Sequence, residues 1–143
     1  MARIAQGYPK NVSERLFLLA SYLLIKGERT FINSAGAGVN YYPEYALPIG
    51  PARDRLPDDV ARYAWNGVYK REFEHAIVVI NPHAEGASLT FPGSFRLVIP
   101  AGGGATGDAE IDAQGQYIGG SLTYQDVTAL TLAPGTAAVL MRK

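Results

Sequence analysis

Glu44 lies in a short segment that is rich in tyrosine. The three tyrosines beside it are Tyr41, Tyr42 and Tyr45. Tyrosine rings can stack on the face of a sugar, and cleavage of a glycosidic bond needs two carboxyl groups, ~5–5.5 Å apart for retention of configuration or ~6.5–9.5 Å apart for inversion. Asp54 and Glu72 are candidates for the second carboxyl group. In the alternative that we favour, Glu44 is structural and caps a helix or forms an ion pair where two segments meet.

The same aromatic residues are candidates for a binding site without catalysis. Rings that lie in one plane and face the solvent would form a platform for a carbohydrate. The predicted platform consists of Tyr41, Tyr42, Glu44, Tyr45 and Trp65. Burial of Trp65 would argue against it. Aromatic residues in a proline-rich segment more often fix that segment to the core, and we favour this second interpretation.

A charged cluster at residues 70–75 is predicted to be the solvated edge of a sheet. Side chains of a strand alternate between two faces, so Arg71 lies on one face while Lys70 and Glu72 lie on the other. A catalytic cluster would need these groups on the same face. Arg71 and Glu72 could also hold the sheet against a loop through partly buried ion pairs.

The remaining polar motifs do not indicate a metal site or a phosphate site. His75 and His83 are eight residues apart and have no third ligand at metal-binding spacing. The glycines at 102–104 and Gly107 lack the Gly-Lys-Ser/Thr ending of a phosphate loop, and we expect a hairpin loop there. We therefore assign no catalytic residue, no metal ligand and no cofactor.

The composition excludes several classes of protein. The 13 basic and 13 acidic residues cancel and are scattered, which argues against nucleic acid or an anionic membrane as the partner. The absence of cysteine excludes disulfides, thiolate catalysis and cysteine-ligated metals, and leaves the cellular compartment open. The longest apolar run, residues 16–25, is about half of the ~20 residues that a membrane span needs.

The first part of the chain, residues 1–66, is predicted to contain one helix, one short strand and a long connector. Asn11 or Ser13 can cap a helix over 12–26, and Gly27 provides its C-terminal stop. Residues 30–33 are β-prone. Residues 39–66 contain four prolines without a clear hydrophobic period, which indicates a long Pro-rich connector.

The second part, residues 67–143, is predicted to be an antiparallel β-sandwich, so the chain as a whole is expected to be mainly β. Its short apolar runs are separated by Asn-Pro, Pro-Gly and Gly-Gly turn signals. The expected strands are 68–74, 76–81, 88–91, 95–99, 109–111, 117–118, 127–132 and 137–142. The first two are expected to form a hairpin that ends at Asn81, and the last two a closing hairpin.

Three segments of the chain resemble the C-terminal portion of glycoside hydrolases. They are residues 42–50 (YPEYALPIG), 67–82 (GVYKREFEHAIVVINP) and 132–140 (LAPGTAAVL). The resemblance implies the end of a (β/α)8 barrel followed by an antiparallel β-sandwich. It implies that the 12–26 helix, the 30–33 strand and the Pro-Glu-Tyr loop are barrel pieces. A whole barrel takes ~250 residues, which this chain cannot hold.

Three functions follow as expectations. The first is a non-catalytic segment whose sandwich supports a barrel that this chain lacks, and we favour it. The second is a stand-alone carbohydrate-binding module, and the third is a small glycosidase that uses Glu44 and a second carboxylate. In addition, the 12–26 helix is apolar around nearly its whole circumference, which predicts a homo-oligomer formed through this helix. If the helix instead packs across the sheet, the chain would be an α+β monomer.

Overall fold

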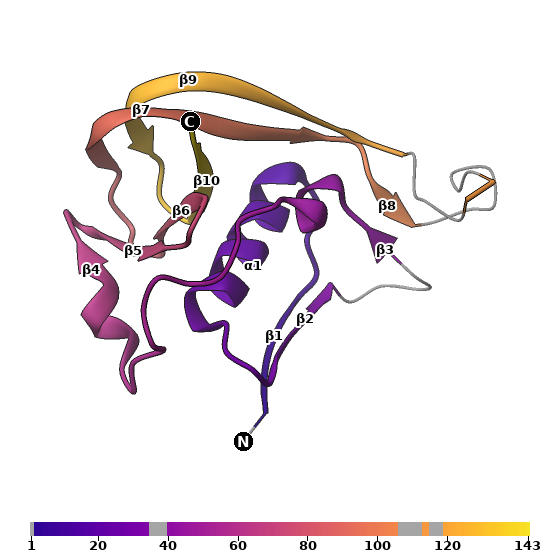
Figure 1. The fold of residues 1–143 in the computed structure, drawn as a ribbon, viewed down its shortest axis with the longest axis horizontal. Coiled ribbons are helices and arrows are strands. Elements are labelled where there is room, and N and C mark those ends of the chain that lie inside the picture. Colours follow the sequence, from indigo (N-terminus) through magenta and orange to yellow (C-terminus); the bar gives the residue numbers. More distant parts are fainter. Residues whose placement is uncertain (1, 35–39, 106–112, 115–118) are drawn as a thin grey trace.

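The computed structural model describes residues 2–34, 40–105, 113–114 and 119–143. Over these residues the fold is mainly β, with one α-helix, a large antiparallel sheet and two small sheets (Figure 1). The large sheet has the strand order β4-β5-β6-β10-β7-β9. Its strands are β4 (Ala64–Trp65), β5 (Val68–Glu72), β6 (Ala76–Asn81), β7 (Ala87–Ala101), β9 (Ser121–Leu132) and β10 (Thr136–Arg142).

The N-terminal elements form a β-α-β unit. Strands β1 (Arg3–Gly7) and β2 (Thr30–Ser34) pair in parallel, and helix α1 (Val12–Ile25) connects them. A further two-stranded sheet pairs β3 (Asn40–Tyr41) with β8 (Gly104–Ala105). The connector between β3 and β4 contains two short 3₁₀ helices, η1 (Pro43–Ala46) and η2 (Val60–Tyr63). No helix in the described part of the chain is long and apolar enough to cross a membrane.

Helix α1 begins where the sequence predicts it. The side chain of Asn11 accepts a hydrogen bond from the backbone N–H of Glu14 at 2.9 Å, and the Glu14 carboxylate accepts one from the backbone N–H of Lys10 at 2.6 Å. The first bond satisfies an amide that the first turn of a helix leaves unpaired, and the second holds the residue before the N-cap. The helix ends at Ile25, one residue before the predicted end, so the prediction is confirmed.

The large sheet is buried on both faces at its central strand β6. Every residue of β6 is buried, and its side chains alternate between the two faces. Ala76, Val78 and Ile80 pack in one apolar cluster with α1. Ile77 and Val79 pack in a second cluster with Leu89, Phe91 and Phe95 of the curved strand β7 and its surroundings (Figure 1). The predicted hairpin of β5 and β6 is confirmed, with Tyr69 opposite Ile80 and Glu72 opposite Ile77.

Two predictions about strand connections are wrong. Pro92 and Gly93 do not reverse the chain between two short strands, because β7 runs from Ala87 to Ala101 with a register shift between Thr90 and Phe95. The predicted closing hairpin also does not form, since β10 pairs with β6 and β7 and not with β9. The expected strands at 109–111 and 117–118 lie outside the described residues.

The burial of β10 explains its position in the sheet. Residues 137–141 are all buried, whereas β9 has one buried residue, Leu132, at its end. A strand that is apolar on both faces is best covered in the middle of a sheet, and a strand with a polar exposed face is best placed at the edge. β10 therefore inserts between β6 and β7, and β9 forms the edge.

Candidate functional site

Glu44 is buried in an ion pair with Arg15 of α1. The Arg15 Nε donates to Glu44 Oε1 at 2.8 Å and Nη2 donates to Oε2 at 3.0 Å, which is a bidentate arrangement. The Glu44 side chain has no exposed surface, and that of Arg15 is 9% exposed. The guanidinium carbon of Arg15 also lies 4.5 Å from the centroid of the Tyr42 ring. The structural alternative for Glu44 is the one that this geometry favours.

The same arginine holds a third segment in place. Arg15 Nη1 donates to the backbone carbonyl of Gly102 at 2.7 Å. The next residue, Gly103, has a φ of +88°, and a Cβ atom there would lie 3.0–3.1 Å from atoms of Pro43 and Tyr42. A side chain would therefore be strained and crowded at this position. Arg15 thus joins α1, η1 and the loop after β7 in one polar centre.

Neither predicted partner carboxylate, Asp54 or Glu72, shares a hydrogen bond or an ion pair with Glu44 or with Arg15. Asp54 accepts hydrogen bonds from Tyr63 Oη at 2.5 Å and from Arg71 Nε at 3.2 Å. Arg71 in turn binds carbonyls at the C-terminal end of α1, whereas Arg15, which holds Glu44, lies in the first turn. A helix rises ~1.5 Å per residue, so these two anchoring points are separated by about 12 Å along α1.

The tyrosines beside Glu44 do not form a flat row. The rings of Tyr42 and Tyr45 are 5.3 Å apart with an interplanar angle of 89°. Tyr42 is buried, and burial raises the pKa of Tyr45 above its usual value. Tyr45 lines a small cavity of about 200 Å³ between α1 and η1. Tyr41 lies in β3 and is half-buried.

Trp65 lies in β4 at the opposite edge of the large sheet from β9 (Figure 1). Its ring stacks on Phe91 with centroids 5.9 Å apart and an interplanar angle of 28°. The Lys70 Nζ lies 4.5 Å from the centroid of the same ring. Trp65 is half-buried and its ring contacts residues of its own chain. The five predicted binding residues therefore fall into two groups, one around η1 and one on β4.

Arg71 also caps helix α1, a role that its position among charged residues did not indicate. Its side chain is 2% exposed, and its Nη1 donates to the backbone carbonyls of Leu23 at 2.8 Å, Leu24 at 3.2 Å and Lys26 at 2.8 Å. The last carbonyls of a helix have no partner within the helix and carry partial negative charge. Arg71 therefore caps α1 from the neighbouring strand β5.

Asp54 and Tyr63 complete the surroundings of Arg71. Burial, followed by the hydrogen bond to Asp54, raises the pKa of Tyr63 to about 12. The Arg71 guanidinium carbon lies 5.5 Å from the Tyr63 ring centroid. This confirms the expectation that Arg71 holds the sheet against a loop, with Asp54 as the carboxylate.

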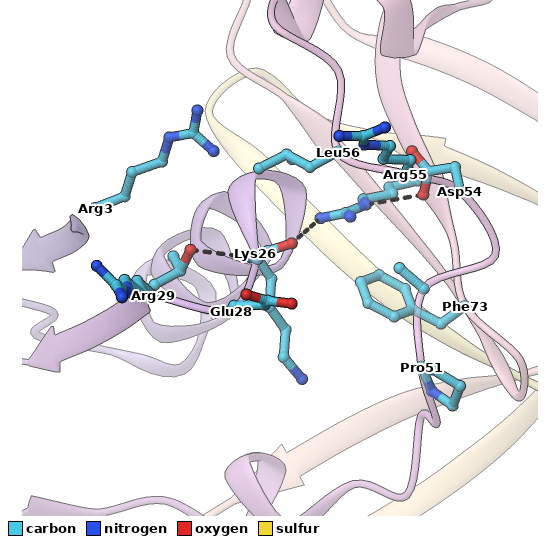
Figure 2. Close-up of a pocket in the computed structure, with 13 residues that line it drawn as sticks. Arg3, Lys26, Glu28, Arg29, Pro51, Asp54, Arg55, Leu56 and Phe73 are labelled. Atoms are coloured by element: carbon cyan, nitrogen blue, oxygen red, sulfur yellow. Dashed lines mark hydrogen bonds and ion pairs between the residues drawn. The ribbon is translucent and has the colours of Figure 1, made fainter. Parts of the chain in front are cut away.

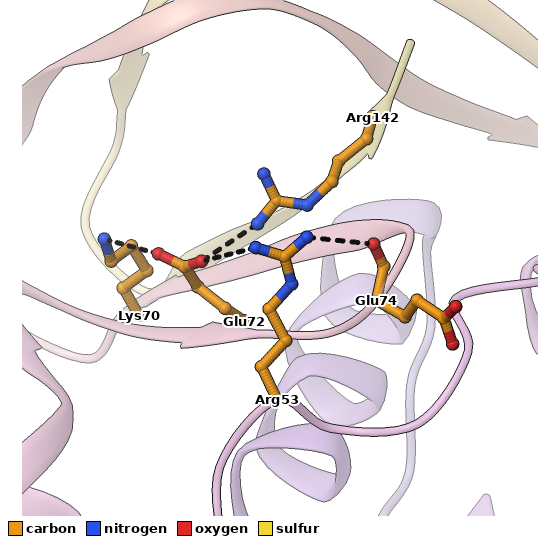
Figure 3. A network of polar contacts seen from close by, with 5 residues as sticks. All are labelled: Arg53, Lys70, Glu72, Glu74 and Arg142. Atoms are coloured by element: carbon orange, nitrogen blue, oxygen red, sulfur yellow. Dashed lines mark hydrogen bonds and ion pairs between the residues drawn. The ribbon is translucent and has the colours of Figure 1, made fainter.

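Glu72 lies at the centre of a second polar network (Figure 3). It accepts hydrogen bonds from Lys70 Nζ at 3.1 Å and Arg142 Nη2 at 2.9 Å, and Arg53 Nη1 lies 3.8 Å away. Burial acts to raise the pKa of Glu72, but Lys70 and Arg142 outweigh it and lower the pKa. The buried Nε of Arg142 has no hydrogen-bond partner. Three cations thus lie around one carboxylate.

Comparison of the chain with protein families, with curated proteins and with solved structures found no match. The class of the protein is therefore defined by its own fold, a β-α-β unit packed on a six-stranded antiparallel sheet.

Proposed function

We propose that this chain is a non-catalytic support for a (β/α)8 barrel of the glycoside hydrolase type, with the remaining barrel strands supplied by another polypeptide segment. The observation that supports this function is the uncovered apolar face of the parallel pair β1-β2. The bidentate pairing of Glu44 with Arg15 gives this carboxylate a structural role and supports the non-catalytic part of the proposal.

The uncovered face carries two large apolar side chains side by side. Ile4 and Phe31 are partners in the parallel register, and they are 63% and 58% exposed. Their neighbours Ala5 and Ile32 lie on the other face, where Ile32 packs in the cluster that contains α1. Parallel sheets are normally covered on both faces. The pair β1-β2 therefore lacks one layer, which the inner layers of a barrel would provide.

In this proposal the large sheet folds over on itself and forms the two layers of the sandwich. Its second apolar cluster combines Ile77 of β6 and Leu140 of β10 with Leu89 and Phe91 of β7. We propose that the curved part of β7, with β9, acts as the second layer of an antiparallel sandwich. The first layer would contain β6 and β10, and its other face packs on α1. Helix α1 in turn contacts both β1 and β2. The support would thus bind the barrel through α1 and the β1-β2 pair.

The test is to translate the genomic sequence upstream of Met1 and to co-express the polypeptide that it encodes with this chain. We expect an encoded series of β/α repeats that co-purifies with the wild-type chain and is lost with the double variant Ile4→Asp/Phe31→Asp. Ile99→Asp is the matched control, since Ile99 is an exposed residue of β7. Equal association of the double variant, absence of β/α repeats upstream, or cleavage of a saccharide by the purified chain would contradict the proposal.

A further inference from the structure

We propose that the cavity between the C-terminal end of α1 and the segment 51–56 binds a small molecule that carries several negative charges. The cavity has a volume of about 900 Å³, within the usual range for small-molecule sites of ~300–1,000 Å³ (Figure 2). Its lining includes Arg3, Lys26, Arg29, Arg55, Leu56 and Phe73. Four cationic residues thus line one cavity that has an apolar wall.

These four cations are not used by the fold. In the described part of the chain, the side chains of Arg3, Lys26, Arg29 and Arg55 form no hydrogen bond and no ion pair. Arg3 lies in β1, Lys26 and Arg29 lie in the segment between α1 and β2, and Arg55 lies in the connector. Folding therefore brings together charges from three separate parts of the chain. Grouping like charges costs free energy unless an anion neutralises them.

The negative groups near the cavity are largely occupied. The C-terminal carbonyls of α1 point toward this end of the helix, but Arg71 donates to those of Leu23, Leu24 and Lys26. Asp54 accepts from Arg71 and Tyr63. Glu28 is the one other carboxylate of the lining, and it is exposed, as are Arg3, Arg29 and Arg55. Four free cations against one free carboxylate leave the cavity with a positive potential.

A second hollow on the other side of the same segment extends this positive surface. It has a volume of about 430 Å³ and is lined by Arg53, Arg55, Arg62 and Lys70 among others. Glu72 pairs with Arg53 and Lys70, which leaves Arg55 and Arg62 without a carboxylate partner. Asp58 and Asp59 follow along the chain, and Asp59 caps η2. Arg55 borders both hollows and is the cation that the proposal depends on most.

The chemistry of guanidinium groups defines the ligand. Arginine binds planar or tetrahedral oxyanions through paired N–H donors, and several arginines favour an anion with several charges over a monovalent one. Phosphate esters and polycarboxylates share this chemistry. Leu56 and Phe73 would contact an apolar part of the same molecule.

The test is thermal unfolding and isothermal titration of the full chain with pyrophosphate, citrate and chloride at equal ionic strength. We expect a saturable rise in Tm with pyrophosphate, citrate or both, and no rise with chloride. A response to pyrophosphate alone would indicate a phosphate-bearing ligand, and a response to citrate alone a polycarboxylate. Equal responses to all three salts, or no response to any, would overturn the proposal.

Variants locate the binding in the cavity. We expect Arg55→Gln and Arg29→Gln each to weaken the Kd at least tenfold. Arg96→Gln is the control, because Arg96 is an exposed arginine on β7, away from the cavity, and it should bind as the wild type does. If either cavity variant failed to fold, the other would still test the proposal. Wild-type affinity in a folded cavity variant would contradict it. The result is independent of the co-expression experiment, since it uses this chain alone.

Discussion

At the scale of single residues, the buried pair of Arg15 and Glu44 should dominate the stability of the N-terminal part. Glu44→Ala leaves the Arg15 guanidinium buried without its carboxylate, and we expect a loss of about 3–5 kcal/mol in the free energy of unfolding, measured by urea denaturation. Glu74→Ala is the control, since Glu74 is 55% exposed, and it should cost less than ~1 kcal/mol.

The double variant Arg15→Met/Glu44→Leu removes both charges but keeps side chains of similar volume. It therefore distinguishes the contribution of the charges from that of packing. Replacement of a buried ion pair by apolar residues of similar volume is often close to neutral, so the double variant should be clearly more stable than Glu44→Ala. A loss of less than ~1 kcal/mol for Glu44→Ala would show that the carboxylate is not buried and paired as the structure has it.

Tyr63 gives a second residue-scale prediction, which concerns alkaline pH. Its pKa is raised on folding from the usual 10.0 to about 12, so the folded state holds the phenol proton that the unfolded state has already lost between these values. The unfolded state then binds fewer protons, and stability falls as the pH rises from about 10 to about 12. We expect a smaller fall in Tyr63→Phe, measured by urea denaturation at pH 9 to 11.5.

Tyr63→Phe removes a hydroxyl group, so the comparison needs a matched Tyr→Phe variant at another position. Tyr124 is 44% exposed, and Tyr124→Phe should keep the alkaline loss of the wild type. Identical pH profiles for Tyr63→Phe and the wild type would exclude the raised pKa of this phenol.

At the scale of elements, Arg71 determines how α1 is attached to the sheet. Arg71→Gln removes the donor to three carbonyls of the last turn and leaves Asp54 without this partner. We expect a loss of about 3 kcal/mol or more, together with faster amide exchange near the C-terminal end of α1. Arg71→Lys should restore part of the stability because the charge remains. Unchanged exchange at the end of α1 would exclude the capping role.

The elements themselves differ in how well the sequence predicts them. The start of helix α1 and the end of strand β6 could be placed because Asn11 and Asn81-Pro82 act locally. Strand β1 was missed since Arg3–Gly7 has little apolar periodicity and depends on its partner β2. The places of β7 and β10 depend on which faces the whole sheet buries, and turn signals such as Pro92-Gly93 do not contain this information.

In the candidate site, too, local features could be predicted from the sequence and long-range contacts could not. The tyrosines around Glu44 were visible in the sequence, but the partner of Glu44 lies 29 residues away. The one available signal was a lone arginine on an apolar helix, which suggests a buried ion pair because an unpaired buried charge is costly. The guanidinium of Arg71 reaches residues 45–48 positions earlier in the chain, which no local pattern could show.

At the scale of the whole molecule, the remaining question is which apolar surface mediates association. The sequence predicts a homo-oligomer formed through the 12–26 helix. In the structure, α1 packs on the large sheet and on β1-β2, and it contributes none of the large exposed apolar residues of the described part. Three of those residues, Ile4, Tyr8 and Phe31, lie on or beside β1-β2. The interface of an oligomer could therefore be formed by α1, as the sequence predicts, or by the exposed face of β1-β2.

Light scattering of two variants distinguishes these surfaces. We expect the isolated chain to associate as its concentration rises, because an uncovered parallel pair exposes apolar area that a second copy can bury. Phe31→Asp should abolish this association if the interface is β1-β2. Leu16→Asp, on the half-buried side of α1, should abolish it if the interface is the helix. From the exposed fractions of Ile4 and Phe31 we predict the first result, and a wild-type monomer at high concentration would contradict both alternatives.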